Sequence, residues 1–270
     1  MTRMTERISI RDLPDVLLSR GIHNATTRQI ENFTGLTAHD VHEGMARLRA
    51  AGKAFSPAKG LYVLIPPQFR SWGSVPAMDF IDPMMKVLDR CYYVALLSAA
   101  EIHGAAHQRP QAFQVMVDRY VPNRILGRAH LQFYINKHVD DTDVVKKNSS
   151  TGTFRVASPE TTALDLATRP GESGGLSNVA TVLRELADGV GLNPEQIVAS
   201  ANHYPMATIR RLGWLLEHVE APVDFTRLEN FVVLSGRKRA SVLLDPSGKR
   251  TGSASRRWGL VENVDVEPDL

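Results

Sequence analysis

Hydrophobic residues at helical spacing open the chain and predict three short helices. The first is predicted over residues 11–20. The second is predicted to begin at Thr26, because a threonine followed three residues later by a glutamine, here Gln29, can satisfy two unpaired amides at a helix start. It should end at Gly35, since glycine readily adopts the left-handed conformation of a tight turn.

The third helix is predicted to start after Thr37, a residue type that caps helix N-termini well. Val41, Met45 and Leu48 then recur at helical spacing and form one apolar stripe, and Gly52 closes the segment. This stripe should face the protein core, which leaves the polar positions between its members on the outer face of the helix.

Two strand-like runs, residues 53–55 and 61–64, follow around a polar turn at residues 56–60. Helix, helix, turn, helix and hairpin in this order predict a winged helix-turn-helix over residues 1–66. Its third helix would fit the major groove of DNA, which is roughly 12 Å wide. The candidate DNA-binding residues lie at the starts of the second and third helices, on the outer face of the third helix and in the wing: Thr26, Thr27, Arg28, Thr37, Ala38, His39, His42, Arg47, Lys53 and Lys59.

A winged helix can instead bind a protein partner or pack within its own chain. Asp40 and Glu43 make the third helix less basic than that of many DNA readers. The residues alone leave both interpretations open.

Residues 66–76 hold three prolines and a glycine without periodicity, and we interpret them as a connector to a second domain at residues 77–270. Helical spacing returns there, together with apolar and polar alternation typical of half-buried strands. Helices are predicted over residues 80–88 and 94–102, and strands over residues 113–117, 131–135, 143–147 and 153–157.

Helical patterns dominate the rest of the second domain. They begin at Ser158-Pro159-Glu160, cover residues 179–186, resume at Asn193 and end over residues 209–219. Two last strands are expected at residues 231–234 and 241–246, around a basic turn at residues 236–239. The predicted fold class is α+β, with an N-terminal winged helix-turn-helix followed by a mixed α+β C-terminal domain.

Composition adds the expectation of a soluble protein of the cytoplasm. Of the 270 residues 43% are hydrophobic and 23% charged, and acidic residues interrupt the first 20, so these do not resemble a secretory signal. The single cysteine, Cys91, agrees with a reducing compartment and is expected in the core.

Positive charge gathers near both ends of the chain. Residues 1–65 hold nine Lys or Arg against six Asp or Glu, and residues 225–257 hold eight against two. The second group could extend a DNA surface, meet an acidic partner or remain a solvated face. These residues form a possible secondary basic surface: Arg237, Lys238, Arg239, Lys249, Arg250, Arg256 and Arg257.

No catalytic motif is recognisable, so we expect no enzyme, no metal and no cofactor. The chain lacks a phosphate-binding loop, a zinc-binding His-Glu-x-x-His motif and a Gly-x-Ser-x-Gly elbow. His39 and His42 lack a third ligand nearby, and Ser158-Pro159-Glu160 is more simply a helix cap than part of a catalytic cluster with Asp165. A metal-dependent nuclease is an alternative, with a candidate cluster of Asp140, Asp141, Asp143, Lys146 and Lys147. Acidic turns beside strands are common, however, so this cluster is not specific.

Four longer motifs resemble the AbiEi-type antitoxins: YYVALLSAAEIHG at residues 92–104, SPETTALDLA at 158–167, IRRLGWLLE at 209–217 and VLLDPSGKRTGSASRRWGLVEN at 242–263. The resemblance implies a transcriptional autorepressor whose winged helix binds inverted repeats in its own promoter, as a dimer or cooperatively. It also implies an antitoxin that counteracts a nucleotidyltransferase-like toxin, through its second domain. Direct protein–protein binding to the toxin, with the winged helix as a packing module, is the alternative.

Overall fold

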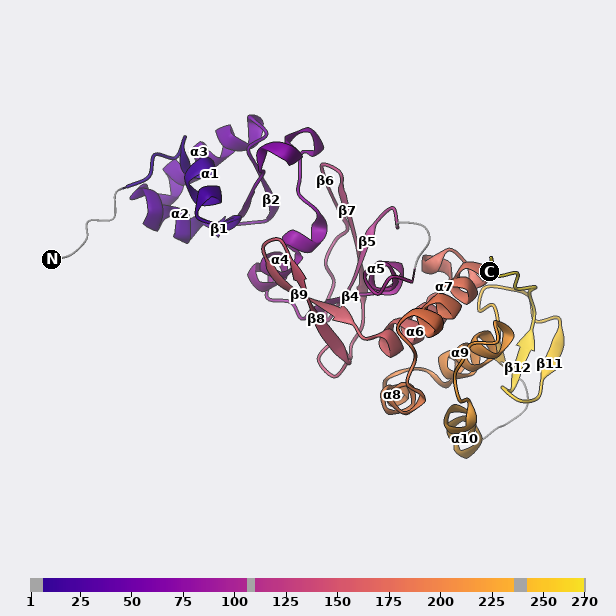
Figure 1. Cartoon of the computed structure of the whole chain (residues 1–270). Helices are drawn as coiled ribbons and strands as arrows, with labels where there is room; N and C mark the ends of the chain where they lie inside the picture. The colour runs from indigo at the N-terminus through magenta and orange to yellow at the C-terminus, as the bar shows by residue number, and fades with distance from the viewer. Residues whose placement is uncertain (1–6, 106–109, 236–241, 270) are drawn as a thin grey trace. The chain divides into compact units, whose positions relative to one another are not determined.

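The computed structural model describes residues 7–105, 110–235 and 242–269 (Figure 1). The chain divides into two compact units. The first consists of Met1–Tyr92, Val117–Ile135 and Lys146–Arg155, and the second of Tyr93–Met116, Asn136–Val145 and Val156–Leu270. Both helices and several sheets are present, which confirms the mixed α+β class. Within the described ranges, no helix combines the length and the apolar character that crossing a lipid bilayer requires.

The first unit opens with three helices and a three-stranded antiparallel sheet of order β1-β3-β2. The second and third helices start at the positions that their capping residues predicted. Thr26 and Gln29 form a capping box at the second helix, Gly35 ends it with a φ of 72°, and Thr37 caps the third. The elements are α1 (Leu13–Ser19), β1 (Asn24–Thr26), α2 (Thr27–Thr34), α3 (Ala38–Ala50), β2 (Ala54–Ala58) and β3 (Leu61–Leu64).

One apolar core holds these elements together. The predicted stripe of α3 is buried in it beside Leu13 and Leu17 of α1 and Ile30 of α2. Gly44 lies in the same face of α3, and a Cβ added there would come within 2.5 Å of Ile10. The small residue therefore allows the chain before α1 to pack closely against α3.

The hairpin differs from its prediction in the extent of its first strand. β2 continues through Ser56 and Pro57 to Ala58, so the turn is shorter than residues 56–60. The register between β2 and β3 shifts between Phe55 and Ala58, around a proline that has no amide to donate. Strand β1 was not predicted, because three residues are too few to show an alternation.

The rest of the first unit contains η1 (Pro67–Trp72), η2 (Ala77–Asp79) and α4 (Ile81–Leu88). The predicted connector thus includes a 3-10 helix, and its Phe69 and Trp72 rings make an edge contact with centroids 5.2 Å apart. Arg128 lies 5.4 Å from the centroid of Trp72 and donates its amide to the Trp72 carbonyl at 2.9 Å.

A six-stranded sheet has the order β6-β7-β5-β4-β9-β8, and the boundary between the two units falls within its strands. Residue Val94 was predicted to start a helix but lies in a strand, and the helix begins at Leu96 after the extended Ala95. Cys91 is half-buried rather than a core residue. The strands are β4 (Tyr92–Val94), β5 (Phe113–Val117), β6 (Arg124–Leu126), β7 (Ala129–Ile135), β8 (Val144–Ser149) and β9 (Gly152–Ala157).

Helices make up most of the second unit. They are α5 (Leu96–Ile102), α6 (Pro159–Thr168), η3 (Gly171–Ser173), α7 (Leu176–Gly189), α8 (Pro194–Ser200), η4 (Ala201–His203), α9 (Met206–His218) and α10 (Thr226–Leu234). Ser158 and Asn193 cap α6 and α8 as predicted. A small sheet of order β10-β12-β11 follows, with β10 (Val242–Leu243), β11 (Ser253–Ser255) and β12 (Leu260–Glu262).

The strand predicted at residues 231–234 is wrong, because these residues form the last turn of α10. Two adjacent valines favour a strand locally, but Leu228 and Val232 are buried four residues apart on one helical face. Burial of that face outweighs the local preference. The predicted basic turn at residues 236–239 lies outside the described residues.

Candidate nucleic-acid interface

The outer face of α3 is polar and open to solvent. Ala38, His39, His42 and Arg47 are all exposed, opposite the buried stripe. His39 has 81% of its side chain accessible and lies 3.5 Å from Glu43, one turn further along the helix. Four of the predicted contact residues thus share one accessible surface.

His42 connects this face to the sheet. Its Nδ1 lies 3.1 Å from the hydroxyl of Tyr62 in β3. Tyr62 itself is buried in the core of the three helices. The contact fixes the orientation of the imidazole and leaves its other ring nitrogen, Nε2, for a second partner.

The threonines at the helix starts are occupied by capping. The Thr26 hydroxyl accepts a hydrogen bond from the Gln29 amide at 3.3 Å. The Thr37 hydroxyl donates to the Asp40 carboxylate at 2.7 Å and accepts from the Asp40 amide at 3.3 Å. Both side chains therefore stabilise the helices that would present the DNA-contacting groups, whatever else they touch.

The remaining predicted residues differ in how accessible their charges are. Arg28 and Lys59 are exposed, whereas Lys53 is half-buried with its ammonium 3.8 Å from Asp15. Thr27 donates its backbone amide to the Gly60 carbonyl at 2.9 Å, which ties the start of α2 to the turn between β2 and β3. Arg28 and Lys59 are thus better placed than Lys53 to meet a phosphate.

Sequence reasoning missed two further cations of this region, Arg7 and Arg49. A Cβ on Gly35 would come within 2.7 Å of the Arg7 side chain, so Arg7 lies over the turn between α2 and α3. Arg49 is exposed in the last turn of α3. Arg7 lies in a segment without periodicity, but the helical spacing of α3 would have placed Arg49 outside the buried stripe.

The possible secondary basic surface divides into three groups. Arg237, Lys238 and Arg239 lie outside the described residues. Lys249, Arg250 and Arg256 are exposed.

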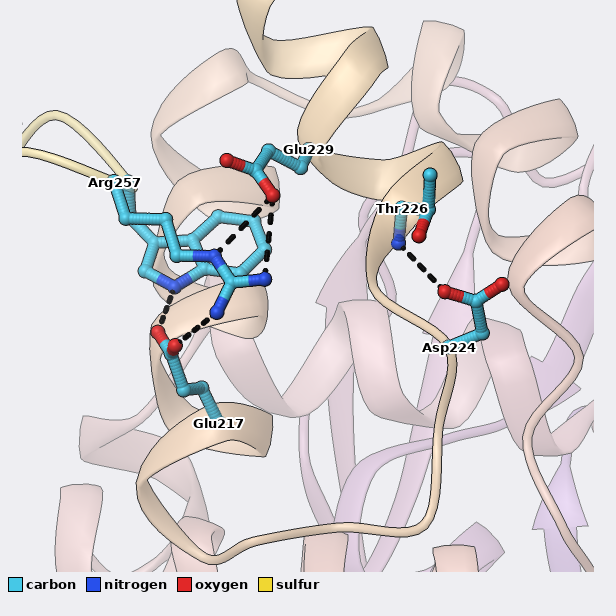
Figure 2. Close-up of polar contacts among 6 residues, drawn as sticks. Glu217, Asp224, Thr226, Glu229 and Arg257 are labelled. Carbon is cyan, nitrogen blue, oxygen red and sulfur yellow. Dashed lines mark hydrogen bonds and ion pairs between the residues drawn. The ribbon is translucent and has the colours of Figure 1, made fainter.

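Arg257 is exposed, but its charge is paired within its own chain. Figure 2 shows its guanidinium between Glu217 and Glu229. Its Nη2 lies 3.2 Å from Oε2 of Glu229. It also lies 5.6 Å from the centroid of Trp258 and 5.8 Å from that of Phe225. Burial lowers the pKa of Arg257, but the hydrogen bond and the charge of Glu217 outweigh it, so the net shift is upward. The guanidinium is therefore occupied by two carboxylates of its own chain.

A second polar group lies in the interior of the second unit, around Asp165 of α6. Its Oδ1 accepts a hydrogen bond from the Tyr204 hydroxyl at 2.9 Å, and the Tyr93 hydroxyl lies 3.5 Å from the same atom. Tyr93 in turn accepts from the Asn136 side-chain amide at 2.8 Å. Burial raises the pKa of Asp165 to about 7, although the bonds from Tyr204 and Tyr93 act in the opposite direction.

The segment that contains this interior is similar to one known family. Residues 93–218 match the family model described as the AbiEi antitoxin C-terminal domain. This segment is similar to the AbiEi antitoxin C-terminal domain, and the matched residues 93–218 are called the AbiEi domain. The resemblance is thus confirmed for this segment. It contains three of the four motifs, and of these it lacks only Tyr92, the first residue of the first motif.

Solved structures extend the likeness in fold only. The crystal structure of the RV2827C protein from Mycobacterium tuberculosis is similar with a TM-score of 0.69 and 16% sequence identity, over 95% of this chain and 93% of that chain. No curated protein matches the sequence. The AbiEi domain supports an antitoxin role, and an antitoxin in general has a toxin as its partner.

The AbiEi motif IRRLGWLLE serves to hold the C-terminal sheet. Arg211 is buried and donates to three carbonyls: Nε to Leu244 at 2.7 Å, Nη1 to Ala167 at 2.6 Å and Nη2 to Leu243 at 3.2 Å. The side chain of this arginine therefore joins α9 to the end of α6 and to strand β10.

The position of Trp258 explains why residue 213 of the same motif is a glycine. The indole is fully buried, and a Cβ on Gly213 would lie 2.1 Å from its ring. Its Nε1 donates to Glu217 at 2.5 Å. Asn263 also acts structurally, because its side chain bonds the backbone of Asp245 at 2.9 and 3.0 Å.

Proposed function

We propose that this protein is an antitoxin that represses its own promoter by sequence-specific DNA binding and counteracts a nucleotidyltransferase-like toxin. In this proposal residues 1–66 are a winged helix-turn-helix and residues 77–270 an antitoxin domain. The AbiEi domain supports the antitoxin part, and the family resemblance supports the autorepressor part and the kind of toxin.

The element order of residues 13–64 supports the winged helix. Helix, strand, two helices and a hairpin pack around one core, and the third helix exposes a polar face along its length. A helix of about 10–12 Å diameter fits the major groove, where its outward side chains reach base edges. We propose that α3 takes this position and that the β2–β3 hairpin is the wing.

The observation that carries the proposal is the exposed position of His39, His42 and Arg47 on one face of α3. Arg47 can bond the O6 and N7 atoms of a guanine, and a histidine can donate to or accept from base edges. Arg28 and Lys59 supply charge for phosphates on either side of that helix, from the start of α2 and from the wing turn.

A binding titration tests the DNA proposal directly. Fluorescence anisotropy at physiological salt would compare a labelled duplex from upstream of the protein's own gene with a duplex of the same length and composition but shuffled sequence. We expect tighter binding to the upstream duplex, by tenfold or more. Equal affinity for the two duplexes would remove the repressor part of the proposal and leave the antitoxin part intact.

A second candidate is an antitoxin that binds its toxin directly, with the N-terminal helices as a packing module. It is favoured by Asp40 and Glu43, which place negative charge on the face that would meet DNA. Co-purification with the toxin encoded beside it separates the two. A stable complex together with equal affinity for both duplexes would favour this candidate.

A further inference from the structure

The carboxyl group of Asp165 is buried in the second unit. Asp165 is 2% exposed, and its Oδ2 is a buried atom with no hydrogen-bond partner. Its Oδ1 has one hydrogen bond of ordinary length, from Tyr204. A buried carboxylate needs an opposite charge or several donors to repay the loss of hydration. The burial of Asp165 therefore favours the neutral acid.

The groups that act on this carboxyl come from separate segments of the second unit. Tyr93 belongs to β4, Tyr204 follows η4, and Arg169 ends α6. The charge of Arg169 favours the ionised acid, but its guanidinium also lies 3.5 Å from Glu172 and is shared with that carboxylate. Burial is the largest effect, and it opposes ionisation.

Hydrogen bonds and ring contacts connect the same segments. Asn136 donates to Tyr93, which connects the chain after β7 to the cluster. His138 and His203 stack with ring centroids 5.4 Å apart and an interplanar angle of 9°. Two stretches, residues 136–143 and 201–205, therefore meet each other. The first is linked to Asp165 of α6 through Tyr93, and the second contacts it directly through Tyr204.

We infer that Asp165, with Tyr93 and Tyr204, forms a proton-dependent contact that keeps residues 136–143 and 201–205 packed on α6 while its carboxyl is protonated. When the carboxyl ionises, this packing weakens. The device belongs to the AbiEi domain and does not depend on DNA binding. It would make the opening of this domain respond to pH between about 4 and 7.

The direction of the pH dependence follows from the linkage between protonation and opening. An aspartate in an unfolded segment has a pKa of about 4, whereas burial raises the pKa of Asp165 to about 7. The closed form thus binds the proton more tightly than the open form. The contribution of this proton to the equilibrium ratio of closed to open form is complete below about pH 4. It falls by up to about tenfold per pH unit as the pH rises to about 7. Above that pH the contribution stays constant.

His138 and His203 are further titratable groups between the same two stretches. A variant that removes only the Asp165 carboxyl keeps this stacked pair, so the contribution of Asp165 can be measured by itself.

The test measures the titration and the opening in the full chain. The ¹³Cγ resonance of Asp165, assigned by its loss in Asp165→Asn, should titrate with a midpoint near pH 7. Hydrogen exchange, expressed as protection relative to unstructured peptides, should show that residues 136–143 and 201–205 lose protection between pH 5 and 7. This loss should be absent in Asp165→Asn and retained in the matched control Asp140→Asn, whose carboxyl is exposed.

Tyr204→Phe gives a second readout that does not depend on the asparagine variant folding. The Tyr204 hydroxyl stabilises the ionised acid, so its removal should move the Asp165 midpoint to higher pH. A midpoint near pH 4 in the wild type, an unchanged midpoint in Tyr204→Phe, or the same protection profile in a folded Asp165→Asn as in the wild type would each overturn the inference.

Discussion

The outer face of α3 and the interior of the AbiEi domain both concentrate polar side chains, but those side chains have different tasks. On α3 the groups are exposed and come from one helix, and few of them contact the rest of the protein. In the AbiEi domain Asp165 and Arg211 are buried and bond to segments distant in sequence. Substitution of the exposed polar groups should therefore affect binding, whereas substitution of the buried ones should affect folding.

Arg211→Met should produce the largest effect, because it removes the donors of three carbonyls and keeps an apolar side chain of similar length. Buried acceptors left without partners cost about 1–3 kcal/mol each, so we expect a loss of about 3 kcal/mol or more in the free energy of unfolding. Urea denaturation followed by circular dichroism measures it. The control is Arg256→Met, at an exposed arginine, and equal midpoints for the two variants would contradict the role of Arg211.

Gly213→Ala should also destabilise the fold, since its Cβ would overlap the Trp258 ring. Overpacking of this kind costs about 1–3 kcal/mol, partly offset by the better helix propensity of alanine, about 1 kcal/mol. Gly189→Ala is the matched control, because a Cβ there meets nothing within 4 Å. Thermal unfolding should show a lower midpoint for the first variant and an unchanged or higher one for the second.

Arg47→Ala should leave folding unchanged, because Arg47 is exposed, and should reduce discrimination between the upstream and shuffled duplexes. The expected loss is about 1–3 kcal/mol for one base contact. Anisotropy titrations with both duplexes measure it. A loss of the same size on both duplexes would place Arg47 on phosphate rather than on a base.

Lys59→Ala should have the smallest effect, a weakening of under about 1 kcal/mol that is similar on both duplexes. It should also make the plot of log affinity against log salt concentration less steep, by a slope of about one, because one counterion fewer is released. A larger effect on the upstream duplex alone would show that the turn between β2 and β3 reads sequence.

Much of the fold was readable from short signals in the sequence. Thr26, Thr37, Ser158 and Asn193 marked helix starts that the structure contains, because a cap depends on neighbours within three residues. The three-residue strands β1 and β6 and the helix α10 were missed. Their conformation depends on distant packing partners rather than on local preference.

The candidate interface was partly predictable for the same reason. Periodicity placed His39, His42 and Arg47 opposite the buried stripe of α3, and their exposure confirms that placement. Periodicity could not show that Arg257 is occupied by Glu217 and Glu229, or that Asp165 meets a tyrosine 72 residues away. Contacts of that range require the tertiary structure.

Methylation interference on the upstream duplex tests the central proposal, that α3 reads the major groove, most directly. If α3 lies there, methylation of a guanine N7, which faces the major groove, should block binding of the wild type but not change the residual binding of Arg47→Ala. If binding is unaffected by methylation at every guanine N7 of the duplex, α3 does not read those bases and the account is contradicted.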